Sequence, residues 1–489
     1  MTVQIHNLSS LLKAIDPLEI SGADSLDINL LTADSRQVAP GTLFVAVRGA
    51  NVDGHRFIPD AISAGASAIV GEEFPVQRPD GVCFIRVADS SDALGRLASQ
   101  WYDNPSEKLT LVGVTGTNGK TTIATLLYEM ARINGLKAGL LSTVSNIVDT
   151  TVYEAVQTTP DPLSIHRLLH EMVQAGCTFA AMEVSSHAAQ QRRIAGLHFK
   201  GGIFTNLTRD HLDYHKTFDA YLKAKKSFFD KLGKDAFALV NADDSHGKVM
   251  LQNTLARKAD YSIQRDADFT ARLMEDRLDG MLLEIGGTEV ETMFTGRFNA
   301  SNLLAVYSAW CLLGHDKEST LLAMSRLRPV AGRFQTIMNP DRTITGVVDY
   351  AHTPDALVNV LDTLREVCGS GRHIITVCGA GGNRDHGKRP LMAQAAAKRS
   401  DRLILTSDNP RNEDPEAILA DMRAGLDADG AARTLSICDR REAIRTAVAL
   451  ASPGDVVLVA GKGHEDYQII GQTKSHFSDI EELGKALGN

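Results

Sequence analysis

The chain has 489 residues, 43% of them hydrophobic and 23% charged, a composition that is ordinary for a globular protein of about two to four domains. Its formal net charge of −9 argues against a general nucleic-acid-binding protein. None of the six cysteines belongs to a C-x-x-C pair, so we expect neither a zinc site nor a disulfide framework. The N-terminus lacks the basic and apolar regions of a signal peptide, and no apolar run approaches a membrane span of about 18 residues. We therefore expect a cytoplasmic protein without a membrane span.

Residues 1–98 precede the first motif with evident chemistry, and we expect them to form a small N-terminal α/β domain. The tripeptide D-S-R at 34–36 is followed by an apolar run at 43–47 and a polar glycine turn at 48–55. The run predicts a strand, and the residue types alone favour ordinary loops on either side of it. The segment W-Y-D-N-P at 101–105 is typical of a linker into the next domain.

A candidate phosphate-binding loop, T-G-T-N-G-K-T-T at 115–122, lies between a predicted strand at 109–114 and a predicted helix that ends near Gly135. Its glycines allow backbone N–H groups to turn towards an anion, and the helix N-terminus adds partial positive charge. Lys120 is placed to reach the β- and γ-phosphates, and a threonine hydroxyl to reach Mg²⁺. The general loop has a glycine where this chain has Val114, so a glycine turn with a chance lysine is the alternative. The agreement of strand, loop and helix favours phosphate binding.

Residues 99–334 are expected to form a central, doubly wound α/β domain around this loop. Candidate strands alternate with helical patterns, which implies a mostly parallel sheet; they lie at 109–114, 179–184, 202–206 and 237–241. Ligands bind at the carboxyl ends of such strands, where Glu183 and Thr205-Asn206 join the glycine loop. A lone glutamate at a strand end is ordinarily a solvated or capping residue. Because Glu183 shares the predicted sheet edge with the loop, we expect its carboxylate to bind Mg²⁺.

A second motif, N-L-T-x-D-H-L-D-x-H at 206–215 followed by Y-x-x-A-K at 221–225, could be a polar loop before a solvated basic helix. Together with the glycine loop it resembles the Mur ligase family, which also includes folylpolyglutamate synthetase. Members of this family use ATP to activate a carboxylate and join it to an amine. In the family the lysine of the A-K motif is carbamylated, and in this chain that position is Lys225 and not Lys226. Carbamylation by CO₂ turns an ammonium into an anionic oxygen ligand for Mg²⁺. The resemblance also implies His211 as a ligand at the metal site.

The N-terminal pattern D-S-R…G-x-x-F-V-A-x-x-G…D-G-H resembles the branch of this family that adds the third amino acid of the peptide. In that branch the N-terminal domain holds the uridine diphosphate end of the substrate, which implies contacts from Ser35, Ala50, Asn51 and Val52. The resemblance implies that the muramoyl-dipeptide is held by Gln157, Thr158, Thr159, Ser185, Gln191 and Arg193. The family often has asparagine where this chain has Gln157, and Arg193 suits a carboxylate or phosphate.

Residues 269–294 alternate like strands, with turn signals D-G at 279–280 and G-G at 286–287. They predict a small antiparallel sheet beside the main one. The motif G-x-x-N-x-x-N at 296–302 then opens a helix. It resembles the adenine-side motif of the family, which implies a nucleotide contact from Asn302.

A proline and glycine segment at 329–333 is expected to end the central domain, and residues 335–489 to form a Rossmann-like C-terminal domain. Its strands are predicted at 344–348, 374–378, 403–406 and 456–460. The glycine run at 379–383 lacks the G-x-G-x-x-G spacing and the acidic partner of a dinucleotide site, so we do not expect NAD. Four motifs that match the Mur ligases follow these strands: D-Y-A-H-T-P-D, N-R-D, D-N-P-R and G-K-G-H-E.

The resemblance assigns the remaining site residues. ATP would be bound by Gly116, Thr117, Asn118, Gly119, Lys120, Thr121, Thr122, Asn302, Arg333, Asp349 and His352, and the metal by Thr121 or Thr122, Glu183, His211 and Lys225. The incoming amino acid would be bound by Arg384, Asp408, Asn409, Pro410, Arg411, Gly461 and Glu465. Family members that add meso-diaminopimelate carry D-N-P-R and lysine-adding members lack the arginine, so Arg411 implies meso-diaminopimelate. The alternative is that Arg411 caps a loop by bonding backbone carbonyls.

The resemblance thus implies an ATP-dependent amide ligase that adds meso-diaminopimelate to UDP-N-acetylmuramoyl-L-alanyl-D-glutamate through an acyl phosphate, with Mg²⁺ as cofactor. The C-terminal domain would close over the reacting groups to keep water out. We expect a monomer that binds no nucleic acid. One alternative is a folylpolyglutamate synthetase-type ligase, which the N-terminal domain and the D-N-P-R motif disfavour. Another is a P-loop nucleotide switch, which the absence of an N-K-x-D motif disfavours.

Overall fold

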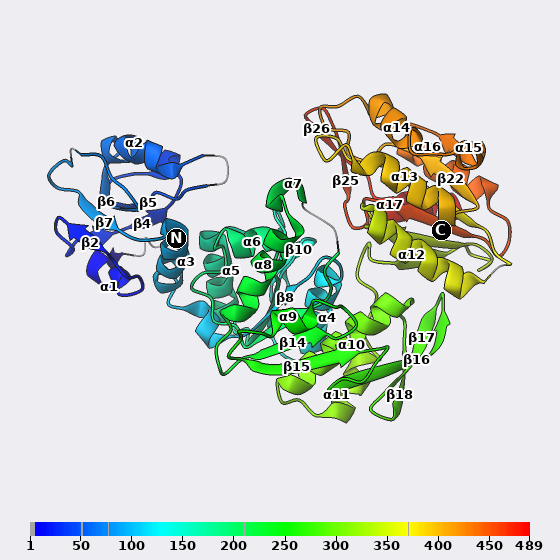
Figure 1. Ribbon diagram of the computed structural model, residues 1–489, viewed down its shortest axis with the longest axis horizontal. Helices are drawn as coiled ribbons and strands as arrows, with labels where there is room; N and C mark the ends of the chain where they lie inside the picture. The colour runs from blue at the N-terminus through cyan, green and yellow to red at the C-terminus, as the bar shows by residue number, and fades with distance from the viewer. Residues whose placement is uncertain (1–4, 50–51, 77, 209–211, 370) are drawn as a thin grey trace. The chain divides into compact units, whose positions relative to one another are not determined.

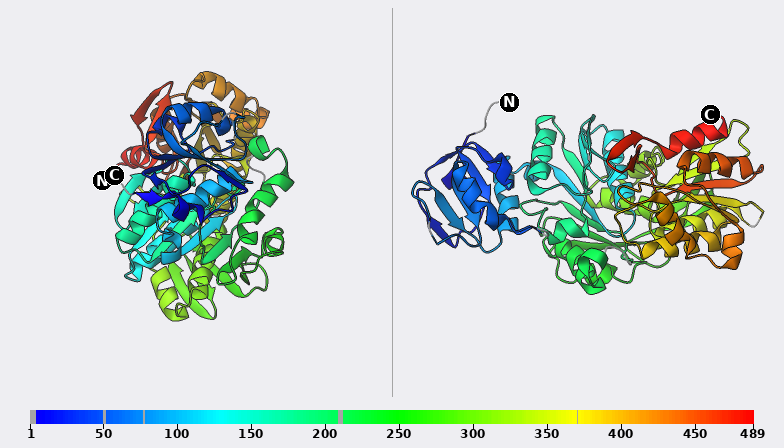
Figure 2. Two further views of the ribbon diagram at one scale, coloured as in Figure 1. Left: turned by 90° about the vertical axis from the view of Figure 1, so that its left-hand side faces the viewer. Right: turned by 90° about the horizontal axis from the view of Figure 1, so that it is seen from above.

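The computed structural model describes residues 5–49, 52–76, 78–208, 212–369 and 371–489. The chain forms two compact units: the first is Met1–Leu207 with His215–Ala259, and the second is Thr208–Tyr214 with Asp260–Asn489. Each unit has its own hydrophobic core. Figure 1 and Figure 2 draw the helices and strands of the chain from three sides. Across the described ranges, no helix is long and apolar enough to cross a membrane. All six cysteines are without a disulfide bond, and the domain boundaries at residues 98 and 334 stay predictions.

The N-terminal part of the first unit is built on a five-stranded sheet with helices on both faces (blue in Figure 1). The strand order is β2 (Glu19–Ser21), β7 (Cys83–Arg86), β6 (Ala66–Gly71), β5 (Thr42–Val45) and β4 (Leu30–Thr32). Strands β4 to β7 are parallel, and β2 is antiparallel to β7. One face packs against α1 (Leu8–Leu12) and α3 (Ser90–Trp101), and the other against α2 (Ile58–Ser63). The apolar run at 43–47 contributes to β5, which confirms the predicted strand.

The chain leaves α3 through a turn in which Asp103 and Asn104 both have left-handed backbone angles, with φ of 60° and 49°. Asparagine and aspartate tolerate this conformation better than other non-glycine residues. The short helix η3 (Pro105–Lys108) follows and leads to the next sheet. This turn thus lies within residues 101–105, the segment predicted to be a linker.

A second, larger sheet carries the glycine loop (cyan to green in Figure 1). In order its strands are β11 (Thr151–Glu154), β10 (Ser145–Val148), β9 (Ala138–Leu141), β12 (Phe179–Glu183), β8 (Thr110–Thr115), β13 (Gly201–Phe204), β14 (Phe237–Asn241) and β15 (Arg257–Ser262). The strands from β9 to β14 are parallel, and β10 and β11 extend one edge antiparallel. All four strands predicted here are confirmed, and the sheet is mostly parallel as expected.

The helix predicted after the glycine loop is α4 (Lys120–Ile133). Its apolar stripe, which includes Ile123 and Leu127, is wholly buried. The helix ends where expected, because Gly135 has φ of 79° and its N–H donates to the carbonyl oxygen of Arg132 at 3.0 Å. The next N–H, of Leu136, donates to the carbonyl oxygen of Ala131 at 2.9 Å, and this pair of bonds is the usual C-terminal cap around a glycine.

The strands predicted within 269–294 are β16 (Phe269–Arg277), β17 (Gly280–Ile285) and β18 (Thr288–Thr292), which pair antiparallel as expected. These strands form the small antiparallel sheet that the sequence predicts, and its edge is joined to the main sheet. Tyr261 and Ser262 at the end of β15 pair in parallel with Phe269 and Thr270 of β16, so this hairpin continues the larger sheet. The pairing covers two residues of each strand, too short a run to leave a periodic signal in the sequence.

One of the two turns in this hairpin is displaced from its prediction. Gly286 and Gly287 have φ of 59° and 83°, the positive angles of a two-residue hairpin turn, which confirms the G-G signal. The first turn instead has Leu278 and Asp279 at its tip, because Arg277 pairs with Gly280. Gly280 is needed for close approach and not for the turn, since a Cβ there would lie 2.4 Å from the carbonyl oxygen of Thr292.

The C-terminal part of the second unit is built on a six-stranded sheet of Rossmann-like type. The order is β19 (Gln335–Met338), β20 (Thr345–Asp349), β24 (Val456–Ala460), β21 (Ile374–Cys378), β22 (Arg402–Leu405) and β23 (Thr434–Ser436). The strands are parallel except for β19. One face packs against α12 (Pro354–Cys368), α13 (Lys388–Arg399) and α14 (Pro415–Arg423), and the other against α16 (Arg440–Leu450) and α17 (Asp479–Leu487). The four strands predicted for this domain are confirmed within one residue at each end.

Candidate active site

The glycine loop follows β8 and is fixed in place by the end of β13. Gly116 has φ of 151°, and a Cβ on it would lie 1.8 Å from Oγ1 of Thr205, so the loop tolerates no side chain there. Thr205 donates its hydroxyl to the carbonyl oxygen of Asn118 at 2.6 Å, and Asn118 donates its N–H to Oδ1 of Asn206 at 2.9 Å. Gly119, with φ of 87°, then opens α4. The first three N–H groups of the helix, from Lys120, Thr121 and Thr122, therefore point out of its N-terminus beside the loop.

Two lysine amines converge on this loop. Lys120 donates Nζ to the carbonyl oxygens of Gly116 and Thr117 at 3.0 and 2.8 Å. Lys225, from α8 (Phe218–Asp230), donates Nζ to the same Gly116 oxygen at 2.6 Å and is 1% exposed. Its amine also lies 4.7 Å from the ring centroid of Tyr221, whose hydroxyl is 3.1 Å from Oγ1 of Thr117. The arrangement concentrates positive charge where a polyphosphate would bind.

Glu183 ends β12 beside the glycine loop, because it stands opposite Val114 of β8 in the parallel register. Its side chain is wholly buried, and Oε1 accepts the N–H of Thr143 at 2.7 Å. No hydrogen-bond partner for Oε2 lies within the described part of the chain. A buried carboxylate oxygen left without a partner is costly, so this atom is suited to receive a cation.

The residues predicted to hold the muramoyl-dipeptide lie together around Thr159 and Arg193. The Thr159 hydroxyl donates to the carbonyl oxygen of Glu183 at 2.8 Å and accepts the N–H of Ser185 at 3.1 Å.

Arg193 donates to the carbonyl oxygen of Thr159 at 2.7 Å and to Oε1 of Gln191 at 2.7 and 3.0 Å. Arg193 also bonds Oε1 of Gln157, and Thr158 accepts the hydroxyl of Thr143 at 3.1 Å. One hydrogen-bond network, buried at Thr159 and Glu183, thus links this cluster to Glu183.

The remaining residues predicted for the first unit are less informative. Ser35 begins the short helix η1 (Ser35–Gln37), which Asp34 caps by accepting the N–H of Arg36 at 3.0 Å, and Val52 is 51% exposed. No backbone hydrogen bond in the described residues joins Ser35 or Val52 to the glycine loop. Ala50, Asn51 and His211 lie outside the described residues.

The predicted nucleotide contacts of the second unit include a buried carboxylate and a stacked arginine. Asp349, at the end of β20, accepts the N–H groups of Phe334 and Ala351 at 2.7 and 2.8 Å, and burial raises the pKa of its carboxyl. The Arg333 guanidinium lies 4.5 Å from the ring centroid of Tyr350. His352 bonds the carbonyl oxygen of Tyr350 at 2.8 Å through Nδ1. Asn302, in α10 (Arg297–Leu312), is buried and donates to Oδ1 of Asn299 at 3.3 Å.

The loops after β21, β22 and β24 bring the predicted amino-acid residues into contact. Asn409 donates to Oε2 of Glu465 at 2.8 Å, and burial, followed by the nearby Asp408 carboxylate, raises the pKa of Glu465. A Cβ on Gly461 would lie 2.7 Å from Oδ2 of Asp408, and a Cβ on Gly382 would lie 1.9 Å from the carbonyl oxygen of Pro410. The loops therefore pack closely enough to require glycine at both positions.

Arg411 has a left-handed backbone, with φ of 53°, and donates Nη1 to the carbonyl oxygen of Gly382 at 2.9 Å. This is the loop-capping contact that the sequence left open as an alternative. The guanidinium has further donors that make no hydrogen bond within the described ranges. A Cβ on Gly381 would lie 3.0 Å from Nη1 of Arg411 and 3.7 Å from Cγ of Arg384, so both arginines flank the same glycine.

Three family models match the chain in succession. They are described as the Mur ligase family catalytic domain at 27–102, the Mur ligase middle domain at 114–310, and the Mur ligase glutamate ligase domain at 332–463. Together they match well over half of the sequence. The chain belongs to the Mur ligase family.

Relatives within the family match this Mur ligase over nearly its whole length. A UDP-N-acetylmuramoyl-L-alanyl-D-glutamate–2,6-diaminopimelate ligase from Parabacteroides distasonis is 58% identical, over 97% of this chain and 98% of its own. An enzyme of the same name from Phocaeicola vulgatus is 55% identical, over 99% of both chains. A solved structure that carries this name is 34% identical with a TM-score of 0.69, and the match covers 98% of each chain.

Two side chains of this Mur ligase to which the sequence assigned no role lie among the predicted ones. Lys462 is wholly buried and donates to Oε2 of Glu465 at 3.1 Å and to Oδ1 of Asn409 at 3.3 Å. The ring of His464 lies 5.1 Å from that of Tyr350, and burial with the nearby Arg333 and Lys462 cations lowers the pKa of His464 to about 3. Both lie within the G-K-G-H-E motif, so the motif was the available signal.

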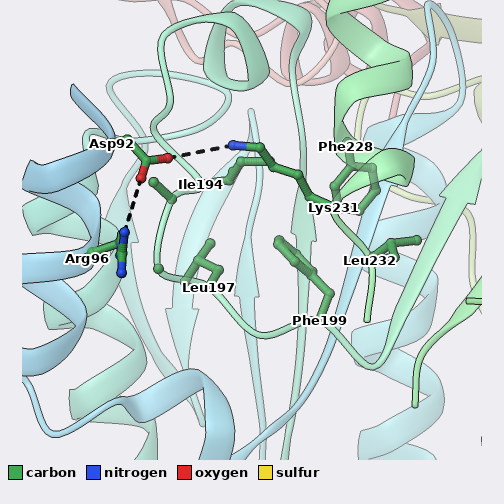
Figure 3. A pocket seen from close by; sticks show the side chains of 10 residues that line it. Asp92, Arg96, Ile194, Leu197, Phe199, Phe228, Lys231 and Leu232 are labelled. Atoms are coloured by element: carbon green, nitrogen blue, oxygen red, sulfur yellow. Dashed lines mark ion pairs between the residues drawn. The ribbon is translucent and has the colours of Figure 1, made fainter. Parts of the chain in front are cut away.

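A cavity of about 300 Å³ lies elsewhere in the first unit of this Mur ligase (Figure 3). Phe199, Phe228 and Leu232 line its apolar side, and at its rim Asp92 forms ion pairs with Lys231 at 3.6 Å and Arg96 at 4.0 Å. Phe199 precedes β13 and Leu232 precedes β14, so the cavity lies at the amino ends of these strands. It is therefore distinct from the glycine loop, which follows a carboxyl end.

Proposed function

We propose that this Mur ligase joins meso-2,6-diaminopimelate to UDP-N-acetylmuramoyl-L-alanyl-D-glutamate at the expense of ATP, in cytoplasmic synthesis of a peptidoglycan precursor. The names of full-length relatives at 55% to 58% identity support this activity. The structural observation that carries the ligase chemistry is the convergence of the Lys120 and Lys225 amines on the glycine loop. We expect a folylpolyglutamate synthetase to lack a domain before the glycine loop. The family-model match at 27–102 therefore argues against that branch.

The reaction proceeds in two chemical steps. The D-glutamate side-chain carboxylate attacks the γ-phosphorus of ATP, forming an acyl phosphate and releasing ADP. An amine of the incoming amino acid then attacks the acyl carbon, and the tetrahedral intermediate expels phosphate and loses a proton to leave an amide. Lys120 and the N-terminus of α4 offset negative charge that builds up on the transferred phosphoryl group. The buried site around Glu183 and Thr159 limits access of water to the activated acid.

The residues present fit a divalent metal. Glu183 offers the buried oxygen without a partner among the described residues, and the hydroxyls of Thr121 and Thr122 lie in the first turn of α4. No cluster of three or more His, Cys, Asp or Glu side chains suited to a metal occurs in the described ranges. This suits Mg²⁺, which is held by few protein oxygens together with phosphates and water. When bound, Mg²⁺ offsets the charge of the phosphate oxygens.

We propose that Glu183, Thr121 or Thr122, His211 and a carbamylated Lys225 hold the metal. Carbamylation forms a bond between Nζ of Lys225 and the carbon of CO₂ and releases two protons from the ammonium nitrogen, so the buried cation becomes an anion. Its amine already lies 2.6 Å from the loop carbonyl of Gly116, next to the phosphate site. Lys226 points elsewhere, since it forms an ion pair with Asp230 one helical turn further on.

The amino-acid site is proposed at the loops of the C-terminal sheet. Glu465 matches the ammonium of the amino-acid end, and Arg384 and Arg411 match carboxylates. Asp408, Asn409, Pro410 and Gly461 would line the site between them. Meso-diaminopimelate differs from lysine by a carboxylate at the distal end. Arg411 would bind that carboxylate, and would repel the single distal ammonium of lysine.

The UDP-linked substrate and the nucleotide complete the proposal. Ser35, Ala50, Asn51 and Val52 would hold the uridine diphosphate end, and Gln157, Thr158, Thr159, Ser185, Gln191 and Arg193 the dipeptide. Gly116 to Thr122, Asn302, Arg333, Asp349 and His352 would bind ATP. A monomeric state is a further prediction, to be checked by sedimentation.

Product mass is the test. The protein is incubated with ATP, Mg²⁺, the UDP-linked dipeptide and one of meso-diaminopimelate, lysine, ornithine or glutamate. We expect a UDP-tripeptide only with meso-diaminopimelate, and phosphate release only when both acceptor and amino acid are present. Equal phosphate release without them indicates a nucleotide switch, and a product from lysine at the same rate contradicts the assigned amino acid.

A further inference from the structure

Arg440, the first residue of α16, is one of the largest wholly buried side chains of the protein. Its Nε donates to Oδ1 of Asp479 at 2.7 Å and its Nη2 donates to Oδ2 at 2.7 Å. Asp479 begins α17 and is also wholly buried. This two-pronged ion pair fixes the plane of the guanidinium.

The remaining donors of Arg440 bond the backbone at the carboxyl ends of two strands. Nη2 donates to the carbonyl oxygen of Ala460 at 3.0 Å, and Nη1 donates to that of Ser407 at 3.5 Å. Ala460 directly precedes Gly461, and Ser407 directly precedes Asp408. One guanidinium therefore bonds the last carbonyl before each of two loops, 408–411 and 461–465.

The sheet does not join these two loops directly. The strands before them, β22 and β24, are not hydrogen-bonded neighbours, because β21 lies between them. Arg411 forms backbone hydrogen bonds with Ile469 and Gly471, after the second loop, at 3.0 and 2.6 Å, but among the described residues no backbone hydrogen bond joins loop 408–411 to loop 461–465 itself. The contacts between the two loops are therefore made by side chains. Arg440 bridges the two strand ends through the carbonyl oxygens of Ser407 and Ala460. Further along the two loops, Asn409 donates to Oε2 of Glu465 at 2.8 Å.

We infer that Arg440, oriented by Asp479, is a positioning residue for the amino-acid substrate. It sets the separation of loops 408–411 and 461–465, so that Arg411 and Glu465 reach opposite ends of one molecule. The inference rests on the proposed function, since it takes these loops to be the amino-acid site. Apolar residues of the same size would typically stabilise the fold as well as a buried ion pair does. We therefore take the role of this pair to be the spacing of the two loops.

The informative substitution is Arg440→Lys. It keeps the charge beside Asp479 but replaces a planar group of five donors by a single ammonium, which cannot hold the carboxylate and both carbonyls in the same plane. We expect the KM for meso-diaminopimelate to rise about ten-fold or more, a loss typical of misplacing a substrate group by a fraction of an ångström to about 1 Å. The KM values for ATP and for the UDP-linked dipeptide should change by less than about two-fold.

A matched control exists at the opposite edge of the same sheet. Arg365, in α12, donates to Oδ2 of Asp401 at 2.8 Å and to the carbonyl oxygens of Arg372 and Arg399 at 3.2 and 3.3 Å. It thus bonds a carboxylate and two backbone carbonyls, as Arg440 does, but beside the amino ends of β21 and β22. Arg365→Lys should leave all three KM values unchanged, whatever its effect on the melting temperature.

Asp479→Asn gives a graded second variant. The carboxamide keeps the shape of Asp479 and one acceptor, while Arg440 keeps its backbone bonds, so we expect a smaller rise in the meso-diaminopimelate KM. If Arg440→Lys yields no folded protein, this variant decides the question in its place. A KM for meso-diaminopimelate that stays within about two-fold of wild type, or that rises only in step with the KM for ATP, overturns the inference. Wild-type protein that fails to ligate meso-diaminopimelate contradicts the proposed function instead.

Discussion

The amines of Lys120 and Lys225 both donate to the carbonyl oxygen of Gly116, at 3.0 and 2.6 Å, although the two residues come from different helices of the first unit. Two cationic groups on one carbonyl oxygen repel each other, and the repulsion is weakly screened because Lys225 is buried. The pair therefore favours either an anion beside the loop or conversion of one amine into an anionic group. The proposed function uses both, with Lys120 facing phosphate and Lys225 carbamylated.

The carbamate hypothesis predicts different results for two adjacent lysines. Lys225→Ala should lower the ligation rate by about 10²-fold or more, because it removes a proposed metal ligand. A short carboxylate such as acetate, added at high concentration, should partly restore the rate by entering the space that the side chain leaves. Steady-state ligation rates with and without the added carboxylate measure this.

Lys226→Ala is the control for that experiment. Lys226 forms an ion pair with Asp230 on its own helix and, among the described residues, no hydrogen bond or ion pair with the glycine loop. The substitution should change the rate by less than about two-fold, the range expected for an i,i+4 pair. Reversed effects at the two lysines would show that the wrong residue has been assigned.

Oε2 of Glu183 has no hydrogen-bond partner in the described part of the chain, and this leads to a prediction about both stability and metal affinity. Glu183→Gln removes a buried negative charge and keeps the shape of the side chain. Without Mg²⁺ the variant should melt at a higher temperature than wild type, since burying an unpaired charged oxygen costs at least about 1–3 kcal/mol. The Mg²⁺ concentration for half-maximal activity should rise about ten-fold or more, because a neutral amide is a poorer ligand than a carboxylate.

Calorimetry in a metal-free buffer and a Mg²⁺ titration of activity measure the two quantities. Thr159→Val is a suitable companion variant, because Thr159 bonds the backbone carbonyl of Glu183 and not its carboxylate. It should lower the melting temperature and leave the Mg²⁺ requirement unchanged. A Glu183→Gln protein that is less stable than wild type without Mg²⁺ argues against a cation-accepting oxygen.

Sequence patterns predicted the strands that are buried on both faces. Strands β8 and β12 are almost entirely buried, and such strands have continuous apolar runs that are easy to recognise. The antiparallel edge strands β10 and β11 were missed. Every residue of β11 is exposed, so burial imposed no alternation on its sequence. The strand forms through its pairing with β10, a contact that single-strand periodicity does not encode.

Motifs located the candidate site along the chain but did not give its contacts. The sequence placed Asn409 and Glu465 in separate motifs, whereas the structure shows them bonded to each other and both bonded to Lys462. Arg440 and Asp479 are 39 residues apart and belong to no recognised motif, so their pairing required three-dimensional coordinates. Residue type predicts what a side chain can bind, and tertiary packing decides which partner it meets.

A buried histidine makes stability depend on pH. His166, in α5 (Pro162–Gln174), is wholly buried, and burial lowers its pKa from 6.5 to about 4 although it bonds the carbonyl oxygen of Ala195. Between pH 6.5 and 4 the unfolded chain binds a proton that the folded chain does not, so stability falls as pH falls through this window. The loss attributable to this group is about 3 kcal/mol at most.

His166→Gln should flatten that part of the profile. The free energy of unfolding, from urea titrations at pH 7 and pH 5, should fall less on acidification for the variant than for wild type. The same substitution at His170, one turn further along α5 and half-buried, controls for general effects on the helix. Parallel profiles for wild type and His166→Gln would remove His166 as a source of acid sensitivity.

The choice between meso-diaminopimelate and lysine is predicted to depend on Arg411. Its left-handed backbone, with φ of 53°, is a conformation that asparagine adopts more readily than arginine or alanine. Arg411→Asn is the better variant, since asparagine tolerates the conformation and also loses the guanidinium. The KM for meso-diaminopimelate should rise by about 10²-fold, the loss expected when a bidentate charge-assisted contact is removed, and the KM for ATP should stay unchanged.

Arg411→Lys separates the two roles that the structure leaves to this side chain. A lysine keeps a positive charge towards the distal carboxylate but loses the planar donors and the Nη1 contact with the Gly382 carbonyl. If substrate recognition dominates, Arg411→Lys should retain discrimination against lysine as substrate, while Arg411→Asn should lose most of it, because removing the cation removes the repulsion. If loop capping dominates, both variants should lose meso-diaminopimelate affinity equally and discriminate as wild type does. The ratio of kcat/KM for the two amino acids, measured for the three proteins, distinguishes these outcomes.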